Sequence, residues 1–410
     1  MVSRFALTAS FVALLLSPAT GFAGSRGPLQ IIVSKDQQSL VVYDGDAVIA
    51  TSPVSTGKAG HATPTGIFSI LEKRRHHKSN IYSNAPMPFM QRLTWSGIAL
   101  HGSNHVPDYP ASHGCVRLPS AFAASLYKMT ERGVHVLISD RQITPAEVKS
   151  ALLFRPAPSE VLPPLSDVPL RPAISQAGDT PVEVAMTEPA GGAAGAVKST
   201  AEPIRILITR SDARDAMREV QASLEFLGYA PGTIDGHAGP ATIAALRAFQ
   251  TSEGIESDSK LTPELTDRLL RKAGRMPPQN GKILVRQGFK PLFEAGLTIN
   301  KPEEALGTHF LQFRHNEEEG AEGKWFGVSL ENHLPASTKK RLGISIDADP
   351  FAYNAIQRTL ARMTISDDVR KRVEGLLAEG SSLSIADTES GLETGQGTDF
   401  ITITRARPGD

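Results

Sequence analysis

The sequence predicts a multidomain protein with a mainly β segment, a small all-α bundle of three helices and an α+β C-terminal segment. Short runs rich in strand-forming residues and separated by turn residues fill residues 28–140. Apolar residues at helical spacing fill residues 212–274, and both element types occur in residues 280–410. A stretch rich in Pro, Ala, Gly and Ser at residues 154–203 predicts a flexible linker.

The first segment contains several short predicted strands and one helix. We expect the strands at Leu29 to Val33, Ser39 to Tyr43, Ala47 to Ser52, Gly66 to Leu71, Ile98 to His101 and Val134 to Ser139. Ser120 is placed to cap a helix that carries Phe122, Leu126 and Met129 on one face, and Gly133 is placed to end it.

The second and third segments have different patterns. In residues 212–274, a first apolar helical stripe ends before Gly228, a second begins at Ile243, and Thr262-Pro263 opens a third helix. In the last segment, we expect helices at Pro350 to Met363 and Asp367 to Glu379, and strands at Ser382 to Ala386 and Phe400 to Thr404.

The N-terminus and the composition restrict location and partners. Arg4, the apolar run after it and the small residues before Gly24 have the layout of a signal peptide spanning residues 1–23. No later apolar run reaches the length of about 20 residues that a membrane span needs. Acidic and basic residues are equal in number, which does not favour nucleic acid as a partner. We therefore expect a periplasmic or cell-wall-associated protein without a membrane span after signal removal.

The single cysteine, Cys115, lies beside several residues suited to acyl transfer. A thiol is a strong nucleophile only as the thiolate, so catalysis by Cys115 needs a nearby base. His101 and His113 are both candidates, and His101 is preferred because it ends a predicted strand. The alternative is a buried, inert cysteine.

Three further residues complete this candidate site. Gly102 and Gly114 would let the backbone approach a substrate, and amide groups near Cys115 could stabilise an oxyanion. Arg117 carries a planar group suited to a carboxylate, of the substrate or of the protein itself.

Two other features of this region have competing interpretations. His101, His105, His113 and Cys115 are residue types that bind zinc, but Val106, Pro107 and Pro110 predict a loop, so we expect no metal and no cofactor. The basic cluster at residues 73–78 is interpreted either as a lid or as a solvated loop.

The stretch HGSNHVPDYPASHGCVRLP resembles the signature of the L,D-transpeptidase catalytic domain, the YkuD type. The resemblance extends over about Leu29 to Ser139 and includes the Thr63-Pro64-Thr65-Gly66 turn. It implies that Cys115 takes the acyl group of a peptidoglycan tetrapeptide stem, releases D-Ala and passes the group to an amine. It also implies that His101 is the base, that His113 and Arg117 belong to the site, and that the Gly102 carbonyl orients His101.

Residues 227–250, LGYAPGTIDGHAGPATIAALRAFQ, resemble the peptidoglycan-binding domain of the three-helix type. A binding module on a flexible linker would raise the effective concentration of the catalytic domain at the wall. The last segment faintly resembles C-terminal extensions of related transpeptidases, with structural packing and partner docking both open.

Together these resemblances imply a secreted enzyme acting on peptidoglycan stem peptides and glycan strands, with a wall-attached protein as a further acceptor. The alternatives are an L,D-carboxypeptidase, which uses water as the acceptor, and a non-catalytic peptidoglycan-binding protein.

Overall fold

The computed structural model describes residues 27–79, 84–156, 202–255, 261–275, 279–315, 323–389, 394–395 and 397–405. The predicted signal peptide and residues 157–201 of the predicted linker lie outside these ranges. Among the described residues, no helix is long and apolar enough to cross a membrane.

A six-stranded sheet forms the base of the first segment, in the order β18-β4-β9-β1-β2-β3. Every residue of the central strands β1 and β9 is buried, which explains their nearly continuous apolar sequences. The strands are β1 (Leu29–Ser34), β2 (Ser39–Asp44), β3 (Ala47–Pro53), β4 (Thr65–Ser69), β9 (His135–Ser139) and β18 (Thr402–Arg405). The predicted strands of this sheet are confirmed, with shifts of one or two residues at their ends.

A smaller four-stranded sheet lies between β4 and β9 in the chain, in the order β5-β6-β7-β8. It consists of β5 (Glu72–Arg74), β6 (Met90–Arg92), β7 (Ala99–Ser103) and β8 (Val116–Pro119), and helix α1 (Ser120–Met129) follows. Residues of both sheets and of α1 share one hydrophobic core. The predicted cap is wrong: Ser120 is the first helical residue, Pro119 occupies the cap position, and the Ser120 hydroxyl donates to Asn104 Oδ1 at 3.0 Å.

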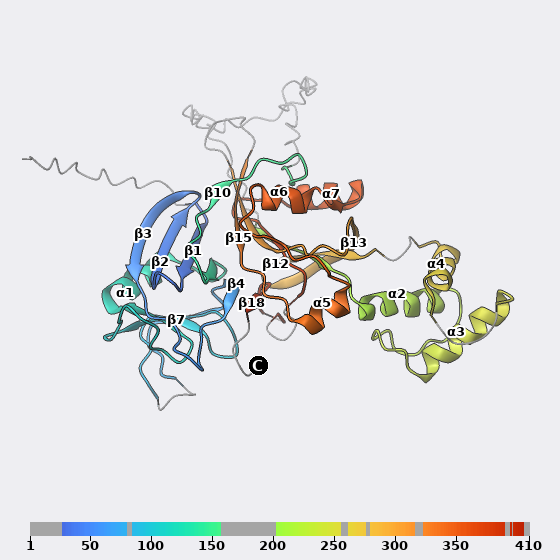
Figure 1. Ribbon diagram of the computed structural model, residues 1–410, viewed down its shortest axis with the longest axis horizontal. Helices are drawn as coiled ribbons and strands as arrows, with labels where there is room; N and C mark the ends of the chain where they lie inside the picture. Colours follow the sequence, from blue (N-terminus) through green and yellow to red (C-terminus); the bar gives the residue numbers. More distant parts are fainter. Residues whose placement is uncertain are drawn as a thin grey trace, which may run out of the picture.

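A second, eight-stranded sheet lies in the middle of the molecule (Figure 1). Its order is β10-β15-β14-β17-β11-β12-β13-β16. The strands are β10 (Ala146–Glu147), β11 (Ile204–Arg210), β12 (Gly281–Gln287), β13 (Lys290–Ile299), β14 (Thr308–Arg314), β15 (Lys324–Leu330), β16 (Met363–Thr364) and β17 (Ser382–Ile385). The helices of this part are α5 (Ala336–Leu342), α6 (Ala355–Leu360) and α7 (Asp367–Glu374).

The predicted three-helix bundle consists of α2 (Ala213–Phe226), α3 (Pro240–Ser252) and α4 (Pro263–Lys272). Its own small core includes Val220, Leu246, Phe249 and Leu269. As predicted, Thr262 caps α4 by accepting from the Leu265 amide. The bundle lies on the far side of the eight-stranded sheet from β1–β3 (Figure 1). Because β11 and β12 pair directly, the bundle is an insertion between two neighbouring strands.

The fold class is confirmed as multidomain, with β, three-helix and α+β parts. The proposed boundaries stay a prediction, and strand pairing joins segments that they separate. Strand β18 comes from the C-terminal segment but pairs with β4, and Phe154, assigned to the linker, is 2% exposed in the core of the second sheet. Helices α6 and α7 are shorter than predicted, ending at Leu360 and Glu374.

Candidate active site

Two neighbouring parallel strands hold the predicted reactive residues. Strands β7 and β8 pair so that His101 lies opposite Arg117, and Cys115 immediately precedes β8. The apolar side chains of Leu100 and Val116 are fully buried, which fixes both strands against the core. His101 and Arg117 therefore stand on a rigid part of the fold.

His101 is buried, with 8% of its surface exposed. Its Nδ1 lies 2.9 Å from the Gly102 carbonyl oxygen. A carbonyl oxygen only accepts hydrogen bonds, so Nδ1 carries the proton and Nε2 of the neutral ring has a free electron pair. Burial lowers the pKa of His101 from its usual value near 6.5, the Gly102 hydrogen bond opposes this shift, and the charge of Arg117 adds to it. The imidazole is thus a neutral base at neutral pH.

Cys115 is half-buried, and its thiol donates to the Gly97 carbonyl oxygen at 3.4 Å. Its side chain packs against a small apolar cluster of Met87, Met90 and Ala99. Cys115 and these apolar residues line the cavity described below.

The backbone around Cys115 is held by side-chain hydrogen bonds. The Ser112 hydroxyl donates to the Cys115 carbonyl at 2.5 Å. The Thr63 hydroxyl donates to the Gly114 carbonyl at 2.8 Å and accepts from the Gly57 amide at 2.8 Å. The sequence patterns did not predict these roles of Thr63 and Ser112. Both residues are polar and lie within the stretches that resemble the family, which was the only indication in the sequence that they belong to the site.

The Gly102 and Gly114 amides are both engaged within the protein. The Gly102 amide donates to the Pro88 carbonyl at 2.8 Å, and the Gly114 amide donates to Ser112 Oγ at 3.1 Å. Oxyanion stabilisation by amide groups near Cys115 stays a prediction. A Cβ atom at Gly102 would come within 3.3 Å of Ala123 and Pro88, so close packing explains the glycine there.

A cavity of about 320 Å³ opens beside Cys115 and His101. Its described lining carries cationic or ionisable basic groups and no carboxylate. These groups are His77, Arg92, His101, His105, His113 and Arg117. None of the ion pairs among the described residues involves Arg117, and both interpretations of Arg117 stay predictions. The cavity suits a ligand with carboxylates.

His113 also lines the cavity but stands beside other basic residues. Its ring contacts the His61 ring edge-on at 4.8 Å. Partial burial lowers the pKa of His113, and the charges of Lys58, His61 and Arg117 lower it further. No group of His, Cys, Asp or Glu in the part of the chain that the structure describes is arranged to hold a metal ion.

The basic cluster at residues 73–78 does not act as one unit. Lys73 and Arg74 belong to β5, where Lys73 donates to the Tyr127 carbonyl at 2.7 Å and Arg74 pairs with Glu72. From this cluster, only His77 lines the cavity. Whether residues 73–78 form a lid or a solvated loop stays a prediction.

Two family models match the chain. Residues 28–138 match the L,D-transpeptidase catalytic domain, YkuD. Residues 28–138 form a YkuD-type domain. Residues 213–269, which contain α2, α3 and most of α4, match the family "Putative peptidoglycan binding domain". Both expected resemblances are thereby confirmed.

Relatives of the YkuD-type domain support the same assignment. "Putative L,D-transpeptidase YqjB" of Bacillus subtilis is 29% identical over 155 residues, which are 33% of this chain and 86% of that protein. "Putative L,D-transpeptidase YkuD" of Bacillus licheniformis is 26% identical over 27% of this chain and 66% of that protein.

Solved L,D-transpeptidase structures are similar to part of the chain. The protein from Stackebrandtia nassauensis is 28% identical over 29% of this chain, with a TM-score of 0.26. The protein from Mycobacterium smegmatis is 23% identical over 27% of this chain, also with a TM-score of 0.26. This chain covers 58% of each of those chains.

Proposed function

We propose that the protein is a secreted L,D-transpeptidase that acts on peptidoglycan stem peptides. The observation that carries this proposal is that Cys115 and His101 line one cavity with basic walls, with the His101 ring held by the Gly102 carbonyl. The YkuD and peptidoglycan-binding family matches support the same substrate. Secretion rests on the signal-peptide pattern of residues 1–23, and the wall-directed domains support a cell-wall location.

The reaction proceeds by two acyl transfers. Nε2 of His101 accepts the thiol proton of Cys115 while the sulfur attacks the carbonyl carbon that precedes the terminal D-Ala of a tetrapeptide stem. The C–N bond breaks, D-Ala leaves with the proton from His101, and a thioester remains on Cys115. An amine of a second stem or of a protein then attacks the thioester and regenerates the thiol. Arg117 binds a carboxylate of the stem.

The experiment is incubation of the purified protein with a disaccharide tetrapeptide, with the products resolved by mass. Dimer formation with loss of alanine supports transfer to an amine. Tripeptide alone would identify water as the acceptor, and absence of turnover with retained wall binding would contradict the enzyme proposal.

Variants of the two reactive residues separate chemistry from binding. Cys115→Ala should lose more than about a thousand-fold in turnover because no other cysteine replaces the nucleophile. His101→Gln should lose about a hundred-fold or more. The exposed His315, which follows β14 and does not line the cavity, provides the control His315→Ala with unchanged turnover. All three variants should still sediment with cell-wall sacculi.

The pH profile tests the state of His101. Because burial lowers its pKa, the neutral base persists below pH 6.5, and turnover should decline only at more acidic pH. An acid limb of the kcat/KM profile centred well above 6.5 would contradict this assignment.

A further inference from the structure

The two large sheets of the molecule share the same arrangement of five strands. In the YkuD-type domain the order is β4-β9-β1-β2-β3, and in the second sheet it is β14-β17-β11-β12-β13. Among these five strands, the first in the chain pairs in parallel with the last, as β1 with β9 and β11 with β17. All other neighbouring pairs are antiparallel. Each strand of one sheet therefore has a counterpart in the other, in the same chain order.

The registers agree as well. Ile31 lies opposite Val42 and Val136, while Ile206 lies opposite Val285 and Leu383. Each hairpin has an irregularity directly after its valine, between Val42 and Tyr43 in one and between Val285 and Arg286 in the other.

The turns after these irregularities also correspond. Gly45 follows β2 and Gly288 follows β12, and both have positive φ, at 68° and 56°. A bulge and a glycine turn at matching positions are specific features of a hairpin, and strand order alone does not require them.

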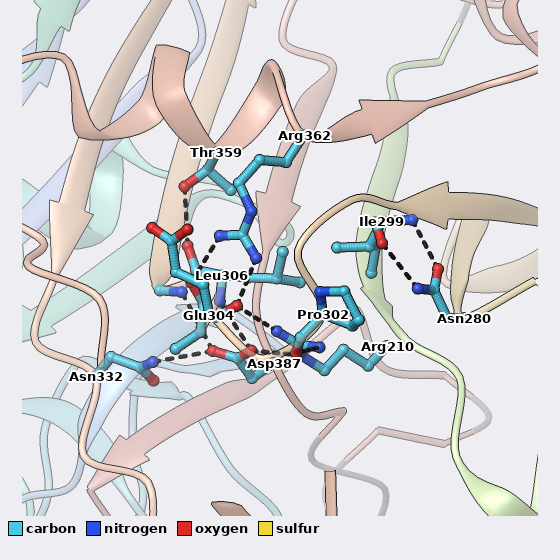
Figure 2. Close-up of polar contacts among 12 residues, drawn as sticks. Arg210, Asn280, Ile299, Pro302, Glu304, Leu306, Asn332, Thr359, Arg362 and Asp387 are labelled. Carbon is cyan, nitrogen blue, oxygen red and sulfur yellow. Dashed lines mark hydrogen bonds and ion pairs between the residues drawn. The ribbon is translucent and has the colours of Figure 1, made fainter. Parts of the chain in front are cut away.

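An ion pair occupies the same place in both sheets. Lys35, directly after β1, pairs with Asp140 after β9 at 2.9 Å. Arg210, at the end of β11, pairs with Asp387 after β17 at 2.7 Å. Figure 2 shows Arg210 and Asp387 at the centre of a network that also holds Leu306 and Asn332.

The connections between the shared strands differ. Between β4 and β9 lie β5–β8, with His101 and Cys115, whereas β15, β16 and α5–α7 lie between β14 and β17. The second sheet therefore has no counterpart of the cysteine nucleophile. Residues 35–38 join β1 to β2, but the peptidoglycan-binding helices α2–α4 lie between β11 and β12.

Each of the two sheets includes a strand from the chain segment that follows the other sheet's last shared strand. Strand β10, which follows β9 in the chain, pairs with β15 of the second sheet. Strand β18, which follows β17, pairs with β4 of the YkuD-type domain (Figure 1). Ile67 and Phe310, which occupy corresponding positions on β4 and β14, lie in an apolar cluster that contains residues of both sheets.

We infer that residues 204–389 are a second, catalytically empty copy of the YkuD scaffold, and that the strand following this copy, β18, positions the loop that carries Cys115. The two copies form an internal dimer with exchanged strands. The role assigned to β18 rests on the proposed function of Cys115 as the nucleophile.

A short chain of contacts links β18 to that loop. The Thr404 hydroxyl donates to Thr65 Oγ1 at 2.8 Å, and both residues are buried. Thr63, two residues before Thr65, donates to the Gly114 carbonyl next to Cys115. Gly66 has a φ of 152°, and a Cβ there would lie 2.0 Å from the Thr402 carbonyl oxygen. Strand β18 therefore fixes the start of β4, and Thr63, just before β4, fixes Gly114.

The test measures Cys115 directly. Cys115 is the single cysteine, so alkylation of the full chain by iodoacetamide, followed by intact mass, reports its reactivity across pH. Thr404→Val should slow alkylation near neutral pH by roughly three- to ten-fold. Thr404→Ser keeps the hydroxyl and should restore the wild-type profile. Gly66→Ala should act in the same direction as Thr404→Val.

The matched control is Val148→Ala, which truncates the core of the second copy beside the other exchanged strand, β10. It should lower the melting temperature without moving the alkylation profile. A Thr404→Val profile that overlays the wild type, or a Val148→Ala profile that moves as far, would overturn the inference. If stem peptides are not turned over but the alkylation profile still responds to Thr404, the proposed function fails while the positioning role of β18 stands.

Discussion

The YkuD-type domain and the second copy share a scaffold, but only one of them has the residues for catalysis. In the first, the connection between β4 and β9 forms the small sheet that carries His101 and Cys115. In the second, the corresponding connection forms β15 and helices, and a binding module occupies the β11–β12 connection. In the function proposed above, the chemistry resides in one connection, while the shared strands provide rigidity.

The corresponding ion pairs also differ in their surroundings. The side chains of Arg210 and Asp387 are 4% and 0% exposed, while those of Lys35 and Asp140 are 16% and 25% exposed. Asp387 also accepts from the Leu306 and Gly307 amides, so it organises the loop before β14. We therefore expect the Arg210–Asp387 pair to contribute more to the stability of the second copy than the Lys35–Asp140 pair contributes to that of the first.

The largest expected effect is that of Asp387→Ala. This change leaves the buried Arg210 guanidinium without its carboxylate, which should lower the free energy of unfolding by about 3–5 kcal/mol. Urea denaturation of the full chain measures the loss. The corresponding change in the first copy, Asp140→Ala, is the control. Equal losses at the two positions would contradict the difference in burial.

An intermediate effect on the free energy of unfolding is expected when the pH is lowered, because His309 is buried. Burial lowers the pKa of His309 from 6.5 to about 4, and the Asp387 charge and the Leu306 carbonyl oppose this only in part. Below pH 6.5 the unfolded chain binds a proton that the folded chain excludes, so stability falls by about 3 kcal/mol as the pH drops from 6.5 to 4. His309→Gln should flatten this dependence, as followed by urea midpoints at each pH.

The corresponding position on β4 is Gly66, which does not titrate. The YkuD-type domain contributes instead through His135, whose pKa burial also lowers well below 6.5. Some acid sensitivity should therefore remain in His309→Gln. An unchanged slope in that variant would contradict the assignment to the second copy.

The smallest effect is expected for Lys35→Ala. A partly exposed ion pair contributes about 0–1 kcal/mol, so the urea midpoint should move little. Raising the salt concentration should weaken this small contribution further. A loss as large as that of Asp387→Ala would show that the first pair is also structurally essential.

The sequence predicted the strands of the first sheet and the reactive pair because both are local patterns. Short strand-forming runs between turn residues reveal β1–β3, and the residues of the motif around Cys115 are close together in the sequence. The orientation of His101 by the Gly102 carbonyl was also anticipated, since the two residues are adjacent.

The remaining features depend on contacts between distant residues. The hydrogen bond from Thr63 to Gly114 spans 51 positions, and β11 and β12 are separated by the entire helical bundle. Strand β18 was expected as a strand, but its partner lies in another segment. Periodicity within a window of residues contains no information on such pairings.

The insertion of α2–α4 between paired strands has a mechanical consequence. A module attached at one end can rotate in all directions, whereas both ends of this bundle lead into adjacent strands. Ion pairs from Lys282 to Asp215 and from Arg341 to Asp212 also hold the start of α2 against the second sheet and α5. The bundle therefore has a fixed orientation relative to the second sheet. In the function proposed above, binding of the bundle to a glycan strand would also fix the direction of the cavity, and this geometry would determine which stem peptides are within reach.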